Sequence, residues 1–193
     1  MKKYKLLFAA LLFAFISGAQ APIKFHTIQG LTILGRPFPN QTTYRRFPDS
    51  LESLLRMPVW QFSTNSTGIA IYFESNSKQI SAKRKTGDKA SYPHVAATLV
   101  KGVDLYAMDN NQWYYVGIGK PNNPLYQEAS IIKGLYGGVK QFLMYLPDYE
   151  TTDSVVIGID SNAMIQHVTN SVFANKKPIV FYGTSIVQGA SAM

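Results

Sequence analysis

Between residues 59 and 170 the chain consists of short runs rich in β-branched and aromatic residues, separated by turn-forming residues. No run in this region keeps a helical period of about 3.6 residues over three turns, whereas short strands with frequent turn signals are typical of an antiparallel sandwich. The sequence therefore predicts a mainly β fold, an antiparallel, jelly-roll-like β-sandwich. The expected strands are Thr67–Glu74, Gln79–Lys85, Val95–Val100, Trp113–Val116, Tyr126–Ile132, Lys140–Leu146 and Ser154–Ile159. The first two flank a turn at residues 75–77 and are expected to form a hairpin.

Two changes of sequence texture mark the ends of this sandwich. Residues 20–57 contain scattered apolar residues and turn formers, so we expect an extended lead-in with one helical turn near residues 50–56, ended by Pro58. The sandwich domain is expected over residues 58–175. After it, Ile179–Tyr182 is a continuous apolar run, which is typical of a strand buried on both faces of a parallel sheet. We interpret residues 176–193 as the start of an α/β domain that is truncated in this sequence.

The first 19 residues have the three regions of a secretory signal peptide. These are the basic residues Lys2, Lys3 and Lys5, the apolar run Leu6–Ile16, and the small residues Ser17, Gly18 and Ala19. The apolar run is too short to span a bilayer, although an N-terminal membrane anchor is the alternative. No cysteine follows the run, which excludes a lipid anchor. We expect cleavage before Gln20, export to the periplasm or the cell exterior, and no stable membrane anchor.

The amino-acid composition excludes several kinds of functional site. The 193 residues include no cysteine, which excludes disulfides, thiolate metal sites and cysteine nucleophiles. The three histidines, His26, His94 and His167, show no metal-binding spacing, so we expect no metal and no cofactor. Without the expected signal peptide, which carries three lysines and no acidic residue, the net charge falls from +8 to +5. The densest basic stretch, residues 78–89, lacks interleaved aromatic residues, and we interpret it as a solvated face rather than a nucleic-acid site.

A Gly-x-Ser turn at the end of a strand is a place where hydrolases hold a nucleophilic serine. Gly183-Thr184-Ser185 follows the apolar run directly, but an α/β-hydrolase elbow would need glycine at position 187, where valine stands. Together with Gly189, the segment instead resembles the first motif block of the SGNH (GDSL-type) hydrolases, a strand followed by Gly-Asp/Thr-Ser-Ile/Leu-x-x-Gly. By this resemblance Ser185 is the nucleophile and its backbone N–H is an oxyanion donor. Thr184 replaces the aspartate of the commonest form.

A second resemblance covers more of the chain. Gly102-Val103-Asp104-Leu105-Tyr106 is similar to the Gly-x-Asp-Leu-Tyr signature of the β-sandwich domain at the N-terminus of certain bacterial SGNH-type esterases. The likeness extends over residues 55–189 in matching order, and residues 22–54 carry nothing similar. Physically, Asp104 can accept hydrogen bonds from backbone amides in a turn that Gly102 permits, and Tyr106 can bury its ring. We expect the signature to be structural rather than to contact substrate.

The resemblance also implies that the catalytic site is incomplete in this sequence. The base of SGNH-type enzymes is expected in an Asp-x-x-His segment near the end of the catalytic domain, and no such segment follows Ser185 here. We therefore expect this chain to be inactive by itself. His94 is an alternative base for Ser185. Trp60 and Trp113 can either stack on a sugar ring or lie buried in the sandwich, which is the commoner case.

Two functions stay open from the sequence. The first is the exported N-terminal part of an SGNH-type serine esterase, which acts on carbohydrate or other esters when full-length. The second is a non-catalytic exported module that binds carbohydrate through exposed aromatic residues, with residues 178–193 as an incidental tail. A reading frame that continues past Met193 into the remaining motifs favours the first, and a stop codon favours the second.

Overall fold

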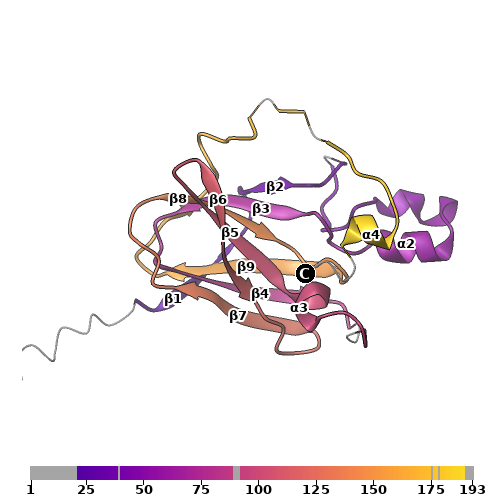
Figure 1. The fold of residues 1–193 in the computed structure, drawn as a ribbon, viewed down its shortest axis with the longest axis horizontal. Helices are drawn as coiled ribbons and strands as arrows, with labels where there is room; N and C mark the ends of the chain where they lie inside the picture. Colours follow the sequence, from indigo (N-terminus) through magenta and orange to yellow (C-terminus); the bar gives the residue numbers. More distant parts are fainter. Residues whose placement is uncertain (1–20, 39, 89–91, 175, 178, 190–193) are drawn as a thin grey trace, which may run out of the picture.

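The computed structural model describes residues 21–189, except 39, 89–91, 175 and 178. Two antiparallel sheets form a sandwich (Figure 1), one with strand order β1-β9-β4-β7 and the other with order β10-β3-β8-β5-β6, where β2 also pairs with β3. The strands are β1 (Ile23–Thr27), β2 (Thr32–Leu34), β3 (Ala70–Ser75), β4 (Gln79–Thr86), β5 (Val103–Asp109), β6 (Gln112–Gly119), β7 (Tyr126–Lys133), β8 (Lys140–Tyr145), β9 (Thr152–Asp160) and β10 (Ile165–Gln166). The predicted mainly β, antiparallel sandwich is confirmed.

The core lies between the two sheets because alternate side chains of each strand point inward. From the six-stranded sheet, Phe73 and Phe142 stack with ring centroids 5.3 Å apart. From the four-stranded sheet, Ile80, Ile157 and Ile159 are fully buried in the same cluster. These two sets of residues give the sandwich its apolar interior.

The predicted hairpin between residues 67–74 and 79–85 is wrong, although both strands exist. β3 pairs with β8 in one sheet, whereas β4 pairs with β7 and β9 in the other. The connection is held in this arched form by Asp160 at the end of β9. Its carboxylate accepts hydrogen bonds from the Ser77 hydroxyl at 3.0 Å, the Lys78 backbone N–H at 2.7 Å and the Gln79 amide at 2.6 Å. Asp160 therefore fixes a crossover between sheets, which a local turn signal does not distinguish from a hairpin.

The predicted strand over Val95–Val100 is also wrong. Ala97–Lys101 forms the short helix α3, with backbone hydrogen bonds from Leu99 and Val100 to the Ala96 carbonyl. Val95 and Val100 are buried with Tyr149 in a small apolar cluster, and a helical turn lets these two residues face the same partner. The run therefore covers part of the sandwich instead of joining a sheet.

The lead-in, residues 20–57, contains more helices and strands than its sequence predicts. β1 pairs with β9 and β2 pairs with β3, so residues 23–34 add a strand to each sheet. A 3₁₀ helix covers Asp49–Leu54, and the helix α2 covers Met57–Ser63. Pro58 does not end a helix but lies in the first turn of α2, where its missing N–H is not needed for helical hydrogen bonding.

After β10 the chain crosses the outer face of the six-stranded sheet. Phe173 stacks on Trp113, with centroids 6.3 Å apart, and meets the Tyr72 ring edge-on at 5.3 Å. Beyond it, the strand predicted over Ile179–Tyr182 is not formed, and these four side chains are 78–92% exposed. A parallel strand needs hydrogen-bonding neighbours, and the described residues provide none here. The last helix that the structure describes is the short α4 (Ser185–Gln188), at the same end of the molecule as α2 in Figure 1.

Among the described residues, no helix is long and apolar enough to cross a membrane. The predicted signal peptide, residues 1–19, lies outside the described residues.

Candidate functional site

Ser185 is the first residue of α4 and lies on an exposed turn. Thr184 is the N-cap in an extended conformation, and Gly189 ends the helix in the left-handed conformation, with φ of 89°. Gly183 is required by close approach, because a Cβ at this position would lie 2.3 Å from Cγ2 of Val187. The glycines of the predicted motif thus build a tight turn that leaves Ser185 open to solvent.

The turn is attached to the sandwich by side-chain hydrogen bonds at both ends of α4. The Gln188 amide donates to the Asp148 carbonyl oxygen at 2.8 Å and to the Thr67 hydroxyl at 3.2 Å. The Thr67 hydroxyl in turn donates to the Asp148 carbonyl oxygen at 2.5 Å. The Tyr149 hydroxyl donates to the Ser185 carbonyl oxygen over a longer distance of 3.4 Å. We call Thr67, Asp148 and Tyr149 the seat of α4.

The Gly-x-Asp-Leu-Tyr signature leads from α3 into β5. Gly102 has φ of −71° and is needed because a Cβ would lie 2.2 Å from the Thr98 carbonyl oxygen. Leu105 is fully buried in the core, while Asp104 and Tyr106 alternate to the outer face of the six-stranded sheet. There, the Tyr106 ring meets the rings of Tyr115 and Tyr145 edge-on at 5.6 and 5.8 Å.

The predicted hydrogen bonds from backbone amides to Asp104 are not found among the described residues. Asp104 is not in a turn but already in a strand, opposite Ile118 and Tyr145, and its side chain is half-buried on the outer face. Burial raises the pKa of its carboxyl group. The signature therefore leaves a partly desolvated acidic group on the sheet surface, and this group influences the nearby seat of α4.

Asp148, in the seat, is the most strongly perturbed carboxyl group that the structure describes. Burial and, to a smaller extent, the negative charge of Asp104 raise its pKa to about 6, against the opposing effect of the Arg46 cation. Its Oδ2 atom lies 4.0 Å from the position that a Cβ of Gly189 would take. The end of the Ser185 motif therefore lies beside a carboxyl group that changes charge near pH 6.

We expect Asp148→Asn to stabilise the fold at pH 8 and to have little effect at pH 4. A raised folded-state pKa means that the protonated carboxyl group contributes stability below about pH 4, and that this contribution is lost as pH rises through about 6. Because the side chain is partly exposed and the substitution also removes the attraction to Arg46, we expect a gain of only about 1–2 kcal/mol at pH 8. Urea unfolding at the two pH values measures it, and an equal loss of stability at both would contradict it.

A buried ion pair between Lys101 and Glu150 adjoins the seat, because Glu150 directly follows Tyr149. The sequence did not indicate this pair. Lys101 Nζ lies 3.7 Å from Glu150 Oε2, and the two side chains are only 9% and 1% exposed. Lys101 also donates to the carbonyl oxygens of Gly87 at 3.1 Å and Pro124 at 2.7 Å. Since Lys101 precedes the signature and Glu150 follows Tyr149, this pair links the start of β5 to the seat of α4.

Part of the basic stretch over residues 78–89 is buried, which corrects its interpretation as a wholly solvated face. Lys83 and Lys85 are exposed and form surface ion pairs with Glu128 and Asp153. Arg84, between them, points inward and donates to the Lys101 carbonyl oxygen at 2.7 Å. Burial lowers the pKa of its guanidinium group to about 10. Period-two alternation along β4 explains why only the middle residue of the three is buried.

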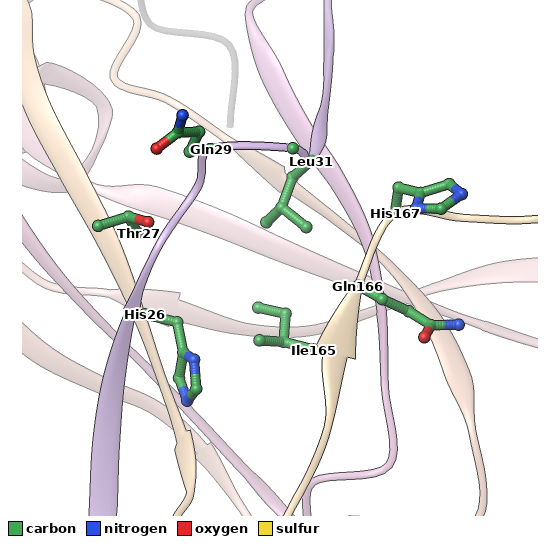
Figure 2. A pocket seen from close by; sticks show the side chains of 8 residues that line it. His26, Thr27, Gln29, Leu31, Ile165, Gln166 and His167 are labelled. Carbon is green, nitrogen blue, oxygen red and sulfur yellow. The ribbon is translucent and has the colours of Figure 1, made fainter.

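Two of the three histidines, His26 and His167, lie near each other although they are far apart in the sequence. His26, on β1, and His167, after β10, line the same open groove of about 350 Å³ between the two sheet edges. Figure 2 shows Leu31 and Ile165 between them, with the His167 ring turned away from His26. The described residues contain no group of three or more His, Cys, Asp or Glu side chains that could hold a metal.

His94 and the two tryptophans lie in the vicinity of other aromatic rings. The exposed His94 is 6.2 Å from the Tyr92 ring, which lies 6.0 Å from the ring of Tyr149 in the seat. Trp60 is buried in α2, and Trp113 is covered by Phe173, so neither indole ring is free to stack on a sugar.

The seat residues were missed because nothing in their local sequence marks them. Thr67 lies 121 residues before Gln188. Thr67 precedes an apolar run and Gln188 follows one, as many polar residues do. A hydrogen bond between such distant positions follows from the fold alone. Of these residues, only Gln188 lies inside a segment that the sequence links to catalysis, the motif block around Ser185.

The chain is similar to known proteins in sequence and in structure. The family model described as GxDLY, the N-terminus of esterase SGNH-hydro-type, matches residues 23–165. No curated protein sequence matches the chain. The crystal structure of a putative GDSL-like lipase from Bacteroides ovatus is similar with 31% identity and a TM-score of 0.81. The match covers 88% of this chain and 49% of that chain, so the present sequence spans about half the length of that protein.

A second structure supports the fold alone. The salicylyl-acyltransferase SsfX3 from a tetracycline biosynthetic pathway is similar with 13% identity and a TM-score of 0.53. That match covers 77% of this chain and 42% of that one.

Proposed function

The chain belongs to the GxDLY family, the N-terminal domain of SGNH-hydro-type esterases, and from this membership we propose that it is part of a serine esterase in which Ser185 is the nucleophile. The observation that carries the proposal is the exposed Gly183-Thr184-Ser185 turn, which directly follows a domain of this family. Substrates would be esters, and we take carbohydrate esters as the substrate class on the resemblance of the motif to SGNH-type bacterial esterases.

The proposed reaction is acyl transfer in two steps. In the first, the Ser185 oxygen bonds to the ester carbonyl carbon, a histidine base takes the hydroxyl proton, and the alcohol leaves with that proton. In the second, water attacks the acyl-enzyme, and the carboxylic acid and the free serine are formed. The Ser185 backbone N–H would donate one hydrogen bond to the developing oxyanion. By resemblance, the histidine belongs to an Asp-x-x-His segment beyond Met193.

The experiment is to express the complete reading frame that contains this sequence and to assay it with 4-nitrophenyl acetate and with an acetylated oligosaccharide. We expect hydrolysis of both, with higher kcat/KM for the carbohydrate ester. The 193-residue chain, assayed in parallel, should show no serine-dependent hydrolysis because it lacks the proposed base. A stop codon at position 194, or a full-length protein that binds carbohydrate without hydrolysing it, would favour a non-catalytic binding module instead.

Export is part of the same proposal. Residues 1–19 have the charge and apolar pattern of a signal peptide, and the first strand of the sandwich begins only at Ile23. Removal of residues 1–19 would therefore leave intact every strand that the structure describes. N-terminal sequencing of the protein recovered after secretion should begin at Gln20, whereas a retained Met1 would contradict the proposal.

A further inference from the structure

From the contacts of α4 we infer that the sandwich positions the nucleophile, with Thr67, Tyr149 and Gln188 as positioning residues for Ser185. The inference rests on the proposed function, since it assigns a role in the same reaction. It gives the N-terminal domain a direct part in catalysis rather than the role of an accessory module.

The helix α4 is too short to hold its own orientation. A helix of four residues has too few internal hydrogen bonds to be stable by itself, because nucleation costs more than one turn returns. The preceding residues, Ile179–Tyr182, make no strand and are largely exposed. Contacts outside the segment must therefore set the orientation of the Ser185 turn in the structure as described.

Both ends of α4 are hydrogen-bonded to the sandwich. Gln188 lies three residues after Ser185, so it is on the neighbouring turn of the same helix. Its amide group reaches two acceptors, the Thr67 hydroxyl and the Asp148 carbonyl oxygen, at 3.2 and 2.8 Å. At the other end of α4, the Tyr149 hydroxyl reaches the carbonyl oxygen of Ser185 itself. Hydrogen bonds at two ends restrict both the position and the rotation of the turn.

The residues of the seat are themselves held in place by backbone hydrogen bonds and packing. The backbone N–H of Ser66, next to Thr67, donates to the Glu150 carbonyl oxygen at 3.0 Å, and that of Asp148 donates to the Leu99 carbonyl oxygen at 3.3 Å. Tyr149 is 5% exposed and packs in the cluster of Val95 and Val100. The seat is thus built on ordered backbone at the ends of β3 and β8, which is the support that a precise catalytic group requires.

The test uses Thr67→Val and Gln188→Met in the full-length protein, assayed with 4-nitrophenyl acetate. Both substitutions keep side-chain size and remove the polar atoms that link α4 to the sandwich. Because a displacement of about 1 Å can cost roughly 100-fold in rate, we expect kcat to fall about 10–100-fold. We expect KM to change less than about twofold, because a positioning residue acts on the Ser185 turn and not on substrate binding. Thr67→Ser, which keeps the hydroxyl, should restore most of kcat, and Tyr149→Phe should have a smaller effect than Gln188→Met.

The control is Thr64→Val. The Thr64 hydroxyl donates to the Gln61 carbonyl oxygen at 2.8 Å within its own helical turn, and not to the Asp148 carbonyl oxygen or Gln188. This variant should keep kcat, and thermal unfolding should show all variants folded. Wild-type kcat in Thr67→Val and Gln188→Met would overturn the inference while leaving the esterase proposal intact. A wild-type protein without Ser185-dependent hydrolysis would instead overturn the proposed function.

A second measurement uses the 193-residue chain and does not depend on activity. Hydrogen–deuterium exchange of the peptide covering residues 183–189 should be faster in Gln188→Met than in the unmodified chain, because its attachment to the sandwich is lost. Equal exchange rates in the two chains would show that the seat does not hold the turn.

Discussion

Ser185→Ala in the full-length protein is expected to lower kcat for 4-nitrophenyl acetate by about four to six orders of magnitude. Loss of the nucleophile in a serine hydrolase typically costs this much, and the remaining turnover comes from binding and oxyanion stabilisation. The fold should be unaffected, because Ser185 is exposed and its side chain makes no hydrogen bond among the described residues. Steady-state kinetics together with the thermal unfolding midpoint separate the two effects.

Ser154→Ala is the matched control for this variant. Ser154 is an exposed serine on β9, so its substitution changes the same atoms in a strand of the sandwich, and kcat should stay at the wild-type value. Unchanged kcat in Ser185→Ala would remove Ser185 from the mechanism. Serine-dependent turnover by the 193-residue chain would show that a base such as His94 lies within reach, contrary to the expectation that the site is incomplete.

Lys101→Met is expected to destabilise the sandwich by about 3–5 kcal/mol, because it leaves the carboxylate of Glu150 buried without its cationic partner. Glu150 is 1% exposed, and the methionine cannot supply the hydrogen bonds that Lys101 gives to Gly87 and Pro124. Urea unfolding of the 193-residue chain measures the loss. In the same experiment, Lys83→Met, which removes an exposed ion pair with Glu128, should cost less than about 1 kcal/mol.

The double variant Lys101→Met/Glu150→Gln tests the cause of this effect. With both charges removed, part of the stability should return, since the main cost of the single change is the loss of the Lys101 cation beside a buried carboxylate. Equal stability of Lys101→Met and Lys83→Met would show that the buried pair contributes no more than a surface one.

Local pattern was enough to predict the class of fold and most of its strands. Period-two alternation over residues 79–85 and the β-branched run over 154–159 correspond to β4 and β9 because each strand has a side that must face the core. The arch between β3 and β4 could not be predicted in this way. Ser75-Asn76-Ser77 is a good turn sequence in either arrangement, and the choice depends on Asp160, more than 80 residues away.

Of the candidate site, only the motif around Ser185 could be predicted from the sequence. Gly183, Ser185 and Gly189 are recognisable together, because a tight turn before a short helix needs glycine at fixed positions. The seat on the sandwich is not recognisable, since Thr67 and Tyr149 acquire their role from tertiary contacts alone. Val95–Val100 shows the same limit, because an apolar run of six residues suits a strand and a buried helical turn equally.

The pairing of β1 with β9 has a consequence for the order of events during synthesis. Ile23 lies opposite Asp160 and Thr27 opposite Val156, and β1 has no other strand partner in the sheet. The first strand that the structure describes therefore meets its partner only after residue 160 has been synthesised, and the four-stranded sheet is completed late. In the export that we propose, this late closure leaves the precursor without its finished sheet while its first residues are threaded through a translocation channel.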